Sequence, residues 1–174
     1  MTLAREMALE SEYVMGTFAR KPVEFVEGHG MTLIDDAGNE YLDFLSGIGV
    51  CSLGHCHPSI VQAVSDQAAK LIHVSNYYYI EHRGEVAQLL SNMLNAYVDE
   101  PSPETWKTFF ANSGAEANEC AVKIARKYGE KRGAYRIVTL ENSFHGRTLT
   151  TLAATGQEGF HRVRHFFLKS TLED

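Results

Sequence analysis

The residues best suited to chemistry lie at the start of a predicted helix, in the sequence Ser113-Gly114-Ala115-Glu116. Ser113 is a good N-cap, and Glu116 three residues later completes a Ser-x-x-Glu capping box. Gly114 leaves the first backbone N–H groups open to a ligand, and the helix dipole favours an anion there. Each N–H contact to a charged ligand contributes roughly 1.5 to 3 kcal/mol, against about 0.3 to 1 kcal/mol from the dipole, so directed hydrogen bonds would dominate. The pattern fits a phosphate site, and it also fits a well-capped helix that binds nothing.

A second polar turn follows the apolar run 135–140 and contains Phe144 and Arg147. Because another apolar run, 106–111, precedes the first turn, each turn follows a predicted strand. In α/β sheets, ligands collect outside the carboxyl ends of the strands. Phe144 offers an aromatic face and Arg147 a planar fork for a carboxylate. The two turns predict a site for a flat, phosphorylated ligand beside an acidic substrate, although Phe144 also fits a core position and Arg147 an exposed surface.

Together, the two turns resemble the class III pyridoxal-phosphate aminotransferases. Further blocks of that family occur in family order between about residue 15 and about residue 157, and the resemblance is greatest to the acetylornithine branch. These blocks are Gly28-His29-Gly30, Tyr41-Leu42-Asp43-Phe44, Gly47-Ile48-Gly49-Val50, Leu53-Gly54-His55-Cys56-His57-Pro58 and Ser75-Asn76.

The resemblance implies an α/β fold, that of the fold-type I pyridoxal-phosphate transferases. The chain would hold the N-terminal segment and the beginning of the large-domain sheet, which is incomplete. The implied cofactor is pyridoxal phosphate, with Ser113, Gly114 and Ala115 at its phosphate. By the same resemblance, Phe144 stacks on the pyridine ring and Arg147 binds the substrate carboxylate.

The implied reaction moves an amino group from N-acetylornithine to 2-oxoglutarate, a step of arginine biosynthesis, in a cytoplasmic homodimer. Ornithine and 4-aminobutyrate are alternative donors. The resemblance places Phe18 near the substrate, at a position where the family often has tyrosine. Phenylalanine lacks the tyrosine hydroxyl and its polar contact to the substrate, so the identity of the amino donor stays open. In this family a lysine forms a covalent bond with the cofactor, and no lysine of this sequence matches it. No catalytic residue is therefore assigned. We expect the chain alone to be inactive, and a non-catalytic truncated product is the other interpretation.

Short apolar runs and helical periodicity predict the elements that position these residues. We expect a domain at 1–57, made of an N-terminal arm and a small antiparallel meander, and the first, truncated part of the cofactor-binding large domain at 58–174. The predicted strands of the meander are 23–26, 31–34 and 41–44, and the predicted helices are 58–71, 81–96 and 116–132. Helices alternating with the runs 106–111 and 135–140 predict an α/β sheet with right-handed crossovers.

Composition excludes several other classes of function. The net charge of -6 argues against a nucleic-acid surface, and the basic, aromatic segment 159–169 is weak evidence for one. No apolar run is long enough to span a bilayer. His55-Cys56-His57 lacks a second ligand pair at a suitable spacing, so no metal site is predicted. The 3 cysteines, an odd number with no secretory signal, indicate reduced thiols.

Overall fold

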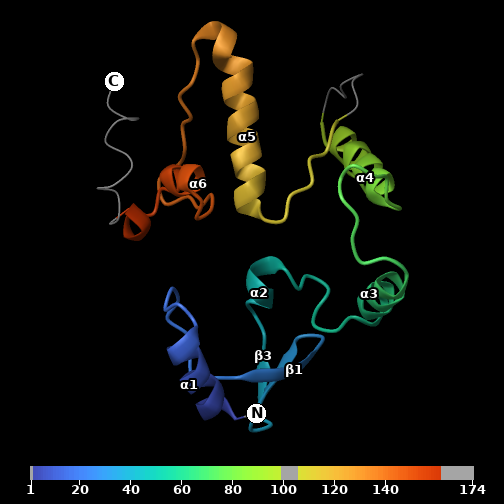
Figure 1. Cartoon of the computed structure of the whole chain (residues 1–174), viewed down its shortest axis with the longest axis vertical. Coiled ribbons are helices and arrows are strands. Elements are labelled where there is room, and N and C mark those ends of the chain that lie inside the picture. The colour runs from blue at the N-terminus through green and yellow to red at the C-terminus, as the bar shows by residue number, and fades with distance from the viewer. Residues whose placement is uncertain (1, 99–105, 162–174) are drawn as a thin grey trace. The chain divides into compact units, whose positions relative to one another are not determined.

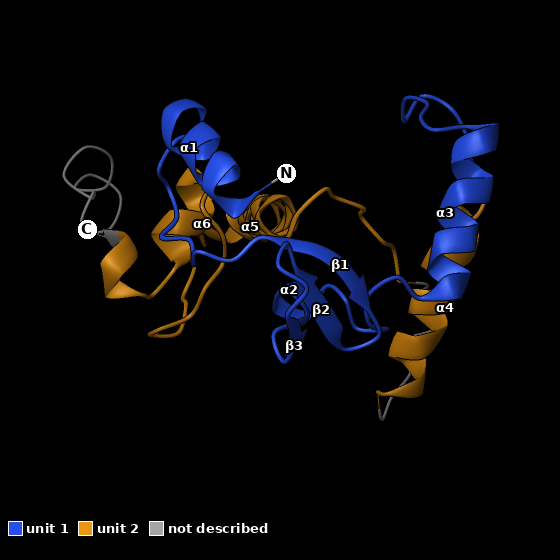
Figure 2. Ribbon diagram, turned by 90° about the horizontal axis from the view of Figure 1, so that it is seen from below, with its two compact units in different colours: residues 1–80 blue, residues 81–174 orange. Residues whose placement is uncertain are grey.

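The structure is a computed structural model that describes residues 2–98 and 106–161 (Figure 1). Its contacts divide the chain into unit 1, residues 1–80, and unit 2, residues 81–174 (Figure 2). The division of contacts at residue 80 does not test the predicted domain boundary after residue 57, which stays a prediction. Residues 162–169 of the basic, aromatic segment lie outside the described residues.

Unit 1 contains a three-stranded antiparallel sheet of β1 (Phe25–His29), β2 (Thr32–Asp35) and β3 (Glu40–Leu42), in the order β1-β2-β3. The predicted meander is therefore confirmed, with strand ends shifted by one to three residues. The rings of Phe25 and Tyr41 meet edge to face with their centroids 5.3 Å apart.

Asp35 organises the turn between β2 and β3. Its carboxylate accepts hydrogen bonds from the backbone N–H of Ala37 at 3.0 Å and of Asn39 at 2.8 Å. It also accepts from the Asn39 side chain at 2.9 Å and the Tyr41 hydroxyl at 2.9 Å. The hydrogen bond from the Asn39 side chain is the main reason why the pKa of Asp35 lies below its ordinary value. The meander is thus closed by donors that lie within six residues of their acceptor.

Three helices complete unit 1: α1 (Leu3–Tyr13), α2 (Ser46–Gly49) and α3 (Pro58–Lys70). Pro58 occupies the first turn of α3, where its missing N–H carries no penalty. The glycine-containing segment 46–49 forms the single turn α2, with left-handed backbone at Gly47 and Ile48.

Unit 2 contains α4 (Arg83–Ala96), α5 (Gly114–Gly129), η1 (Glu130–Arg132), α6 (Leu149–Ala154) and η2 (Glu158–His161). The predicted helices 81–96 and 116–132 are confirmed. The turn at Gly133, with φ of 66°, ends the helical stretch of α5 and η1.

The strands predicted at 106–111 and 135–140 are not formed, and neither segment joins a ladder in the described part of the chain. The prediction of strands at these two places is wrong for this chain. A strand is defined by its hydrogen-bonded neighbour, and the apolar side chains of these runs have none to cover them. Val138 is 93% exposed and Leu140 80% exposed.

Burial follows an unusual pattern within residues 2–98 and 106–161. No hydrophobic side chain there is buried, whereas Thr151 and Thr155 are 0% and 1% exposed. The best-packed point of the described chain is therefore polar, and it lies in and just after α6.

Candidate active site

The first turn of α5 has the geometry that its capping pattern predicts. Ser113 has extended backbone, and its hydroxyl accepts a hydrogen bond from the N–H of Glu116 at 3.2 Å. The Glu116 carboxylate reaches back to the N–H of Asn112 at 2.8 Å, one residue before the cap. At this helix start, the N–H groups of Gly114 and Ala115 have no carbonyl partner within α5. No protein atom lies within 4 Å of where a Cβ on Gly114 would stand, so a ligand has room to approach.

The second predicted turn packs directly on the first. A Cβ on Gly146 would lie 2.7 Å from the Cβ of Ala115, so the two backbones are in close contact. The side-chain amide of Asn118 in α5 donates a hydrogen bond to the carbonyl oxygen of His145 at 2.8 Å. Gly114 and Ala115 are thereby brought beside the Phe144–Arg147 loop, as the sequence predicts.

Phe160 is a site residue that the sequence does not single out. Its ring centroid lies 6.0 Å from that of Phe144 and 5.4 Å from the guanidinium carbon of Arg147. The ring therefore contacts both predicted ligand-binding side chains. In the sequence, the aromatic residue Phe160 lies just beyond residue 157, where the family resemblance ends, so no motif marks it as part of the site.

Glu119 of α5 contacts the residue that precedes α6. Its carboxylate accepts a hydrogen bond from the hydroxyl of Thr148, the N-cap of α6. The Thr148 hydroxyl contributes most to a pKa of Glu119 below its ordinary value. Glu119 is thus a cap supplied by one helix to another, directly after Arg147.

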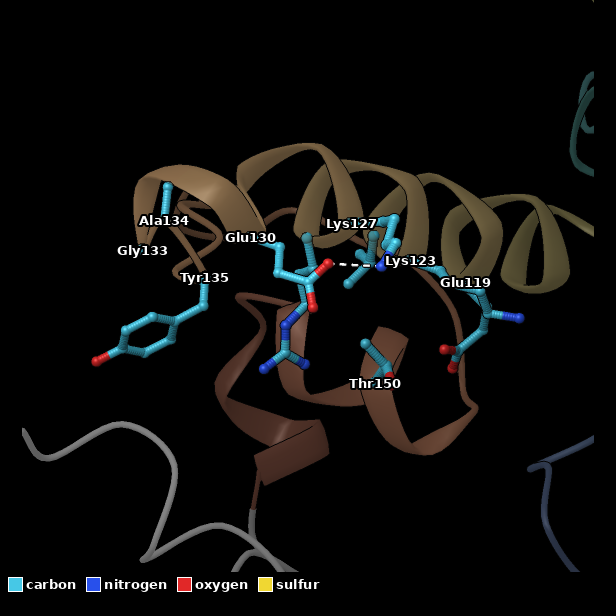
Figure 3. A pocket seen from close by; sticks show the side chains of 10 residues that line it. Glu119, Lys123, Lys127, Glu130, Gly133, Ala134, Tyr135 and Thr150 are labelled. Atoms are coloured by element: carbon cyan, nitrogen blue, oxygen red, sulfur yellow. Dashed lines mark hydrogen bonds and ion pairs between the residues drawn. The ribbon is translucent and has the colours of Figure 1, made fainter.

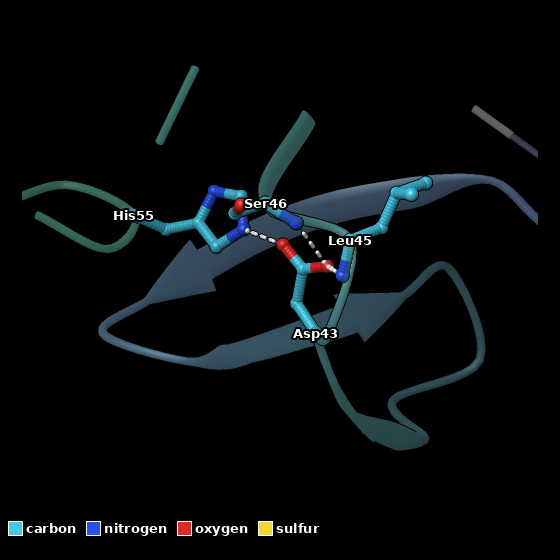
Figure 4. A network of polar contacts seen from close by, with 4 residues as sticks. All are labelled: Asp43, Leu45, Ser46 and His55. Atoms are coloured by element: carbon cyan, nitrogen blue, oxygen red, sulfur yellow. Dashed lines mark hydrogen bonds and ion pairs between the residues drawn. The ribbon is translucent and has the colours of Figure 1, made fainter. Parts of the chain in front are cut away.

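Phe18 lies in unit 1, between α1 and β1, and its side chain is 58% exposed. Its predicted role at the substrate stays a prediction. Unit 1 also holds the hydrogen-bonded pair of Asp43 and His55, with Oδ2 and Nε2 2.7 Å apart (Figure 4). The other carboxylate oxygen accepts from the N–H groups of Leu45 and Ser46. The His55 ring is the main cause of the lowered pKa of Asp43, and the pair ties β3 to the segment before α3.

A groove of about 610 Å³ lies along α5 and is lined by residues of α5 and η1, by residues 133–135 and by Thr150 of α6 (Figure 3). Its lining includes three cations and two carboxylates, among them the pair of Lys127 and Glu130 at 2.5 Å. Gly114, Phe144 and Arg147 do not line it. This groove therefore does not coincide with the predicted ligand-binding residues.

Within the described ranges, no group of three metal-ligating side chains is found. In the same residues, no helix combines the length and the apolar character needed to cross a membrane.

The comparisons with known proteins agree with this geometry. The sequence pattern described as Aminotransferase class-III matches residues 17–172. The acetylornithine aminotransferase of Wolinella succinogenes is 49% identical over 164 residues, which are 92% of this chain and 39% of that protein. The chain thus spans about two fifths of the length of that curated relative.

Two solved structures resemble the chain. The ornithine aminotransferase of Toxoplasma gondii ME49 has a TM-score of 0.77 at 29% identity, and the match covers 94% of this chain and 38% of that one. The taurine:2-oxoglutarate aminotransferase of Bifidobacterium kashiwanohense, solved with PLP and glutamate, has a TM-score of 0.74 at 29% identity, covering 92% and 34%.

These matches confirm the fold class expected from the sequence, part of a fold-type I transferase in which helices and a small antiparallel sheet are present. They also confirm the cofactor, since the matching family uses pyridoxal phosphate. With the family pattern over nearly its whole length and the two motif turns packed against each other, this chain belongs to the pyridoxal-phosphate-dependent class III aminotransferases.

Proposed function

We propose that the protein built on this chain transfers the amino group of N-acetylornithine to 2-oxoglutarate and serves arginine biosynthesis. The packing of Gly146 on Ala115 supports the proposal most directly, because it places the helix start at Gly114 beside the loop that carries Phe144 and Arg147. The name of the 49% identical relative favours N-acetylornithine over ornithine, whose aminotransferase is 29% identical.

The residues of the first turn fit the phosphate of the cofactor. The N–H groups of Gly114 and Ala115 point out of the helix start, and the space beside Gly114 is open. The Ser113 hydroxyl accepts from Glu116, which leaves the serine lone pairs partly used and its O–H able to donate. When bound, pyridoxal phosphate supplies the electron sink for the transfer of the amino group.

Phe144 and Arg147 provide the remaining contacts in this proposal. The exposed Phe144 ring would stack on the pyridine ring, and the exposed Arg147 fork would bind a substrate carboxylate in two parallel hydrogen bonds. Phe160 holds the guanidinium near Phe144 through a cation–π contact, so the carboxylate site and the ring site would stay adjacent. Phe18 stays a proposed substrate contact by resemblance alone.

The lysine that bonds to the cofactor matches no position here, and we propose that a polypeptide of these 174 residues alone is inactive. The domain boundary after residue 57, the homodimer and the cytoplasmic location remain part of the same proposal. Reduction of a mixture with pyridoxal phosphate by borohydride, followed by peptide mapping, tests the inactivity. Scattered, substoichiometric labelling is expected, and one stoichiometric lysine adduct together with glutamate formation would refute it.

The activity itself is testable in a chimera in which residues 1–174 replace the matching part of the Wolinella succinogenes enzyme. Glutamate formation from 2-oxoglutarate would be compared for N-acetylornithine, ornithine and 4-aminobutyrate. The proposal expects N-acetylornithine to give the highest kcat/KM. A higher kcat/KM for ornithine or 4-aminobutyrate would make that compound the donor in place of N-acetylornithine. A soluble chimera that is inactive with all three donors would contradict the proposed function.

A further inference from the structure

Thr155, one of the two best-buried side chains of the described chain, holds the loop between Phe144 and Arg147. The Thr155 hydroxyl accepts a hydrogen bond from the N–H of His145 at 3.0 Å, and its own proton is shared between the carbonyls of Thr151 at 2.8 Å and Gly146 at 3.3 Å. Since His145 and Gly146 lie between the two proposed ligand contacts, one buried hydroxyl fixes the backbone that carries both.

Glu119 fixes the other end of this loop. Its carboxylate accepts a hydrogen bond from the hydroxyl of Thr148, which is the residue after Arg147 and the N-cap of α6. A carboxylate is favoured at a helix N-terminus, and this one comes from α5 rather than from α6 itself. Glu119 therefore joins α6 to the helix whose first turn carries Gly114 and Ala115.

The start of the loop is tied to the chain after α6. The N–H of Gly156 donates to the carbonyl of Ser143 at 2.9 Å, and the N–H of Asn142 donates to the carbonyl of Gly156 at 3.3 Å. With Thr155 at its centre and Glu119 at its end, the loop is held at three points. None of these groups belongs to the proposed ligand contacts.

We propose that Glu119 and Thr155 are positioning residues that set the direction of the Arg147 guanidinium and the Phe144 ring relative to the phosphate-binding turn. The inference rests on the proposed function, and it deepens that function by naming what holds the carboxylate site in place. The Gly114 and Ala115 N–H groups belong to α5, which forms its own cap through Ser113. Loss of Glu119 or Thr155 should accordingly weaken carboxylate binding while phosphate binding is kept.

A purely structural role for the same residues makes a different prediction. If Glu119 and Thr155 only stabilise unit 2, their loss should reduce the affinities for phosphate and for carboxylate together, in step with the fraction of folded protein. The distinguishing readout is therefore the ratio of the two affinities, measured on protein that remains folded.

The experiment uses the chimera with Glu119→Gln and Thr155→Val, each measured for the Kd of pyridoxal phosphate, the KM for 2-oxoglutarate and the Kd of glutarate. Glutarate is an unreactive dicarboxylate, so its calorimetric Kd does not depend on turnover. We expect the KM and the glutarate Kd to rise about tenfold, since small misplacements of a binding group cost one to two orders of magnitude. The Kd of pyridoxal phosphate should change by less than about twofold, because the helix start keeps its own N–H groups.

Two matched variants complete the design. Thr155→Ser keeps the hydroxyl and should restore the glutarate Kd that Thr155→Val loses, whereas Glu130→Gln removes an exposed carboxylate paired with Lys127 and should change neither affinity. Unchanged glutarate affinity in Glu119→Gln and Thr155→Val would overturn the inference, as would parallel losses of both affinities. Failure of the unmutated chimera to form glutamate would contradict the proposed function instead, and the glutarate affinities would still decide the positioning role.

Discussion

The β-meander and the Phe144–Arg147 loop are both held by polar groups, but their partners lie at different distances along the chain. In the meander, Asp35 binds groups of Ala37, Asn39 and Tyr41, all within six residues. In the loop, His145 is bound by Asn118 from 27 residues away, and Thr148 by Glu119 from 29 residues away. The meander closes on itself, whereas the loop depends on another helix.

This difference accounts for which predicted strands form. Each meander strand pairs with the next one along the chain through a short turn. The runs 106–111 and 135–140 need neighbours that are distant in sequence, and they stay unpaired in the described residues. Pairing across short turns is thus present in the meander and absent from these two runs in the described residues.

Gly146→Ala should have the largest effect, because it breaks the contact on which the loop depends. Gly146 has φ of 137°, and an added Cβ would lie 2.6 Å from the Thr151 hydroxyl and 2.7 Å from the Cβ of Ala115. Backbone strain and overpacking should each cost about 1 to 3 kcal/mol. Urea unfolding gives the free energy of unfolding of the chimera, and calorimetry gives its affinity for glutarate. Both quantities should fall.

Gly38→Ala in the meander is the matched control. Gly38 also has positive φ, 83°, but an added Cβ meets no atom within 4 Å. Its cost should be only the conformational strain of about 1 to 2 kcal/mol, with glutarate affinity unchanged. Equal effects of the two substitutions would show that the contact with Ala115 does not matter.

Arg147→Ala should raise the KM of the chimera for 2-oxoglutarate by about 10- to 100-fold, the value of one charge-assisted hydrogen bond. Pyridoxal phosphate affinity should be nearly unchanged, and Arg147→Lys should rescue poorly because an ammonium group cannot form two parallel contacts. Steady-state kinetics and cofactor titration check the outcome. Equal losses of cofactor and substrate affinity would remove Arg147 from the carboxylate site.

Asp35→Asn gives the corresponding change in the meander. It should lower the unfolding midpoint, because the Asp35 charge accepts hydrogen bonds from three residues, but it should leave the KM for 2-oxoglutarate within about twofold of the unmutated value. A KM as poor as that of Arg147→Ala would mean that the two regions do not act separately.

Phe160→Ala should give a smaller effect at the same loop. An exposed cation–π contact contributes about 0.5 to 1 kcal/mol, which corresponds to a two- to fivefold rise in KM. Phe160→Leu keeps apolar bulk without the π face and should behave like alanine if that contact is the cause. A KM unchanged in both variants would assign Phe160 to packing alone.

Acid should remove the stabilising contribution of Glu119, and also that of Asp35. Both pKa values are lowered in the folded chain, so each stabilising contribution is complete above the ordinary value and is lost as the pH falls through the folded value. The ordinary values are 4.5 for Glu119 and 3.8 for Asp35. The stability difference between the unmutated protein and Glu119→Gln should be constant near neutral pH and shrink below 4.5, as urea unfolding at several pH values can show. A difference that grows on acidification would contradict this sign.

Local sequence patterns predict the meander, the helices and the capped start of α5, because proline, glycine and a Ser-x-x-Glu pattern act within a few residues. The contact between the two polar turns is also expected, but the strands on which that expectation relied do not form. The strands predicted at 106–111 and 135–140 fail because strand pairing depends on neighbours that no local pattern specifies.

The role of Glu119 is missed for the same reason. On a helical wheel it falls on the polar face of α5, which is typical of a solvated residue. Its actual partner is the N-terminus of α6, 29 residues later. Long-range polar contacts of this kind have no periodicity in the sequence, and Phe160 is missed because its two partners likewise lie outside its own helix.

The central claim is that the helix start at Gly114 and Ala115 binds the cofactor phosphate, and Gly114→Val tests it most directly. Apart from its chain neighbours and the backbone of its own helix, a Cβ at Gly114 meets no atom within 4 Å, so a side chain there should obstruct the ligand and leave the helix largely formed. The affinities of the chimera and its Gly114→Val variant would be measured for pyridoxal phosphate and for pyridoxal, which lacks the phosphate. We expect at least about a tenfold loss for pyridoxal phosphate, the value of one charged hydrogen bond, with pyridoxal affinity and helix content unchanged. Unchanged affinity for pyridoxal phosphate, or an equal loss for both ligands, would contradict the account.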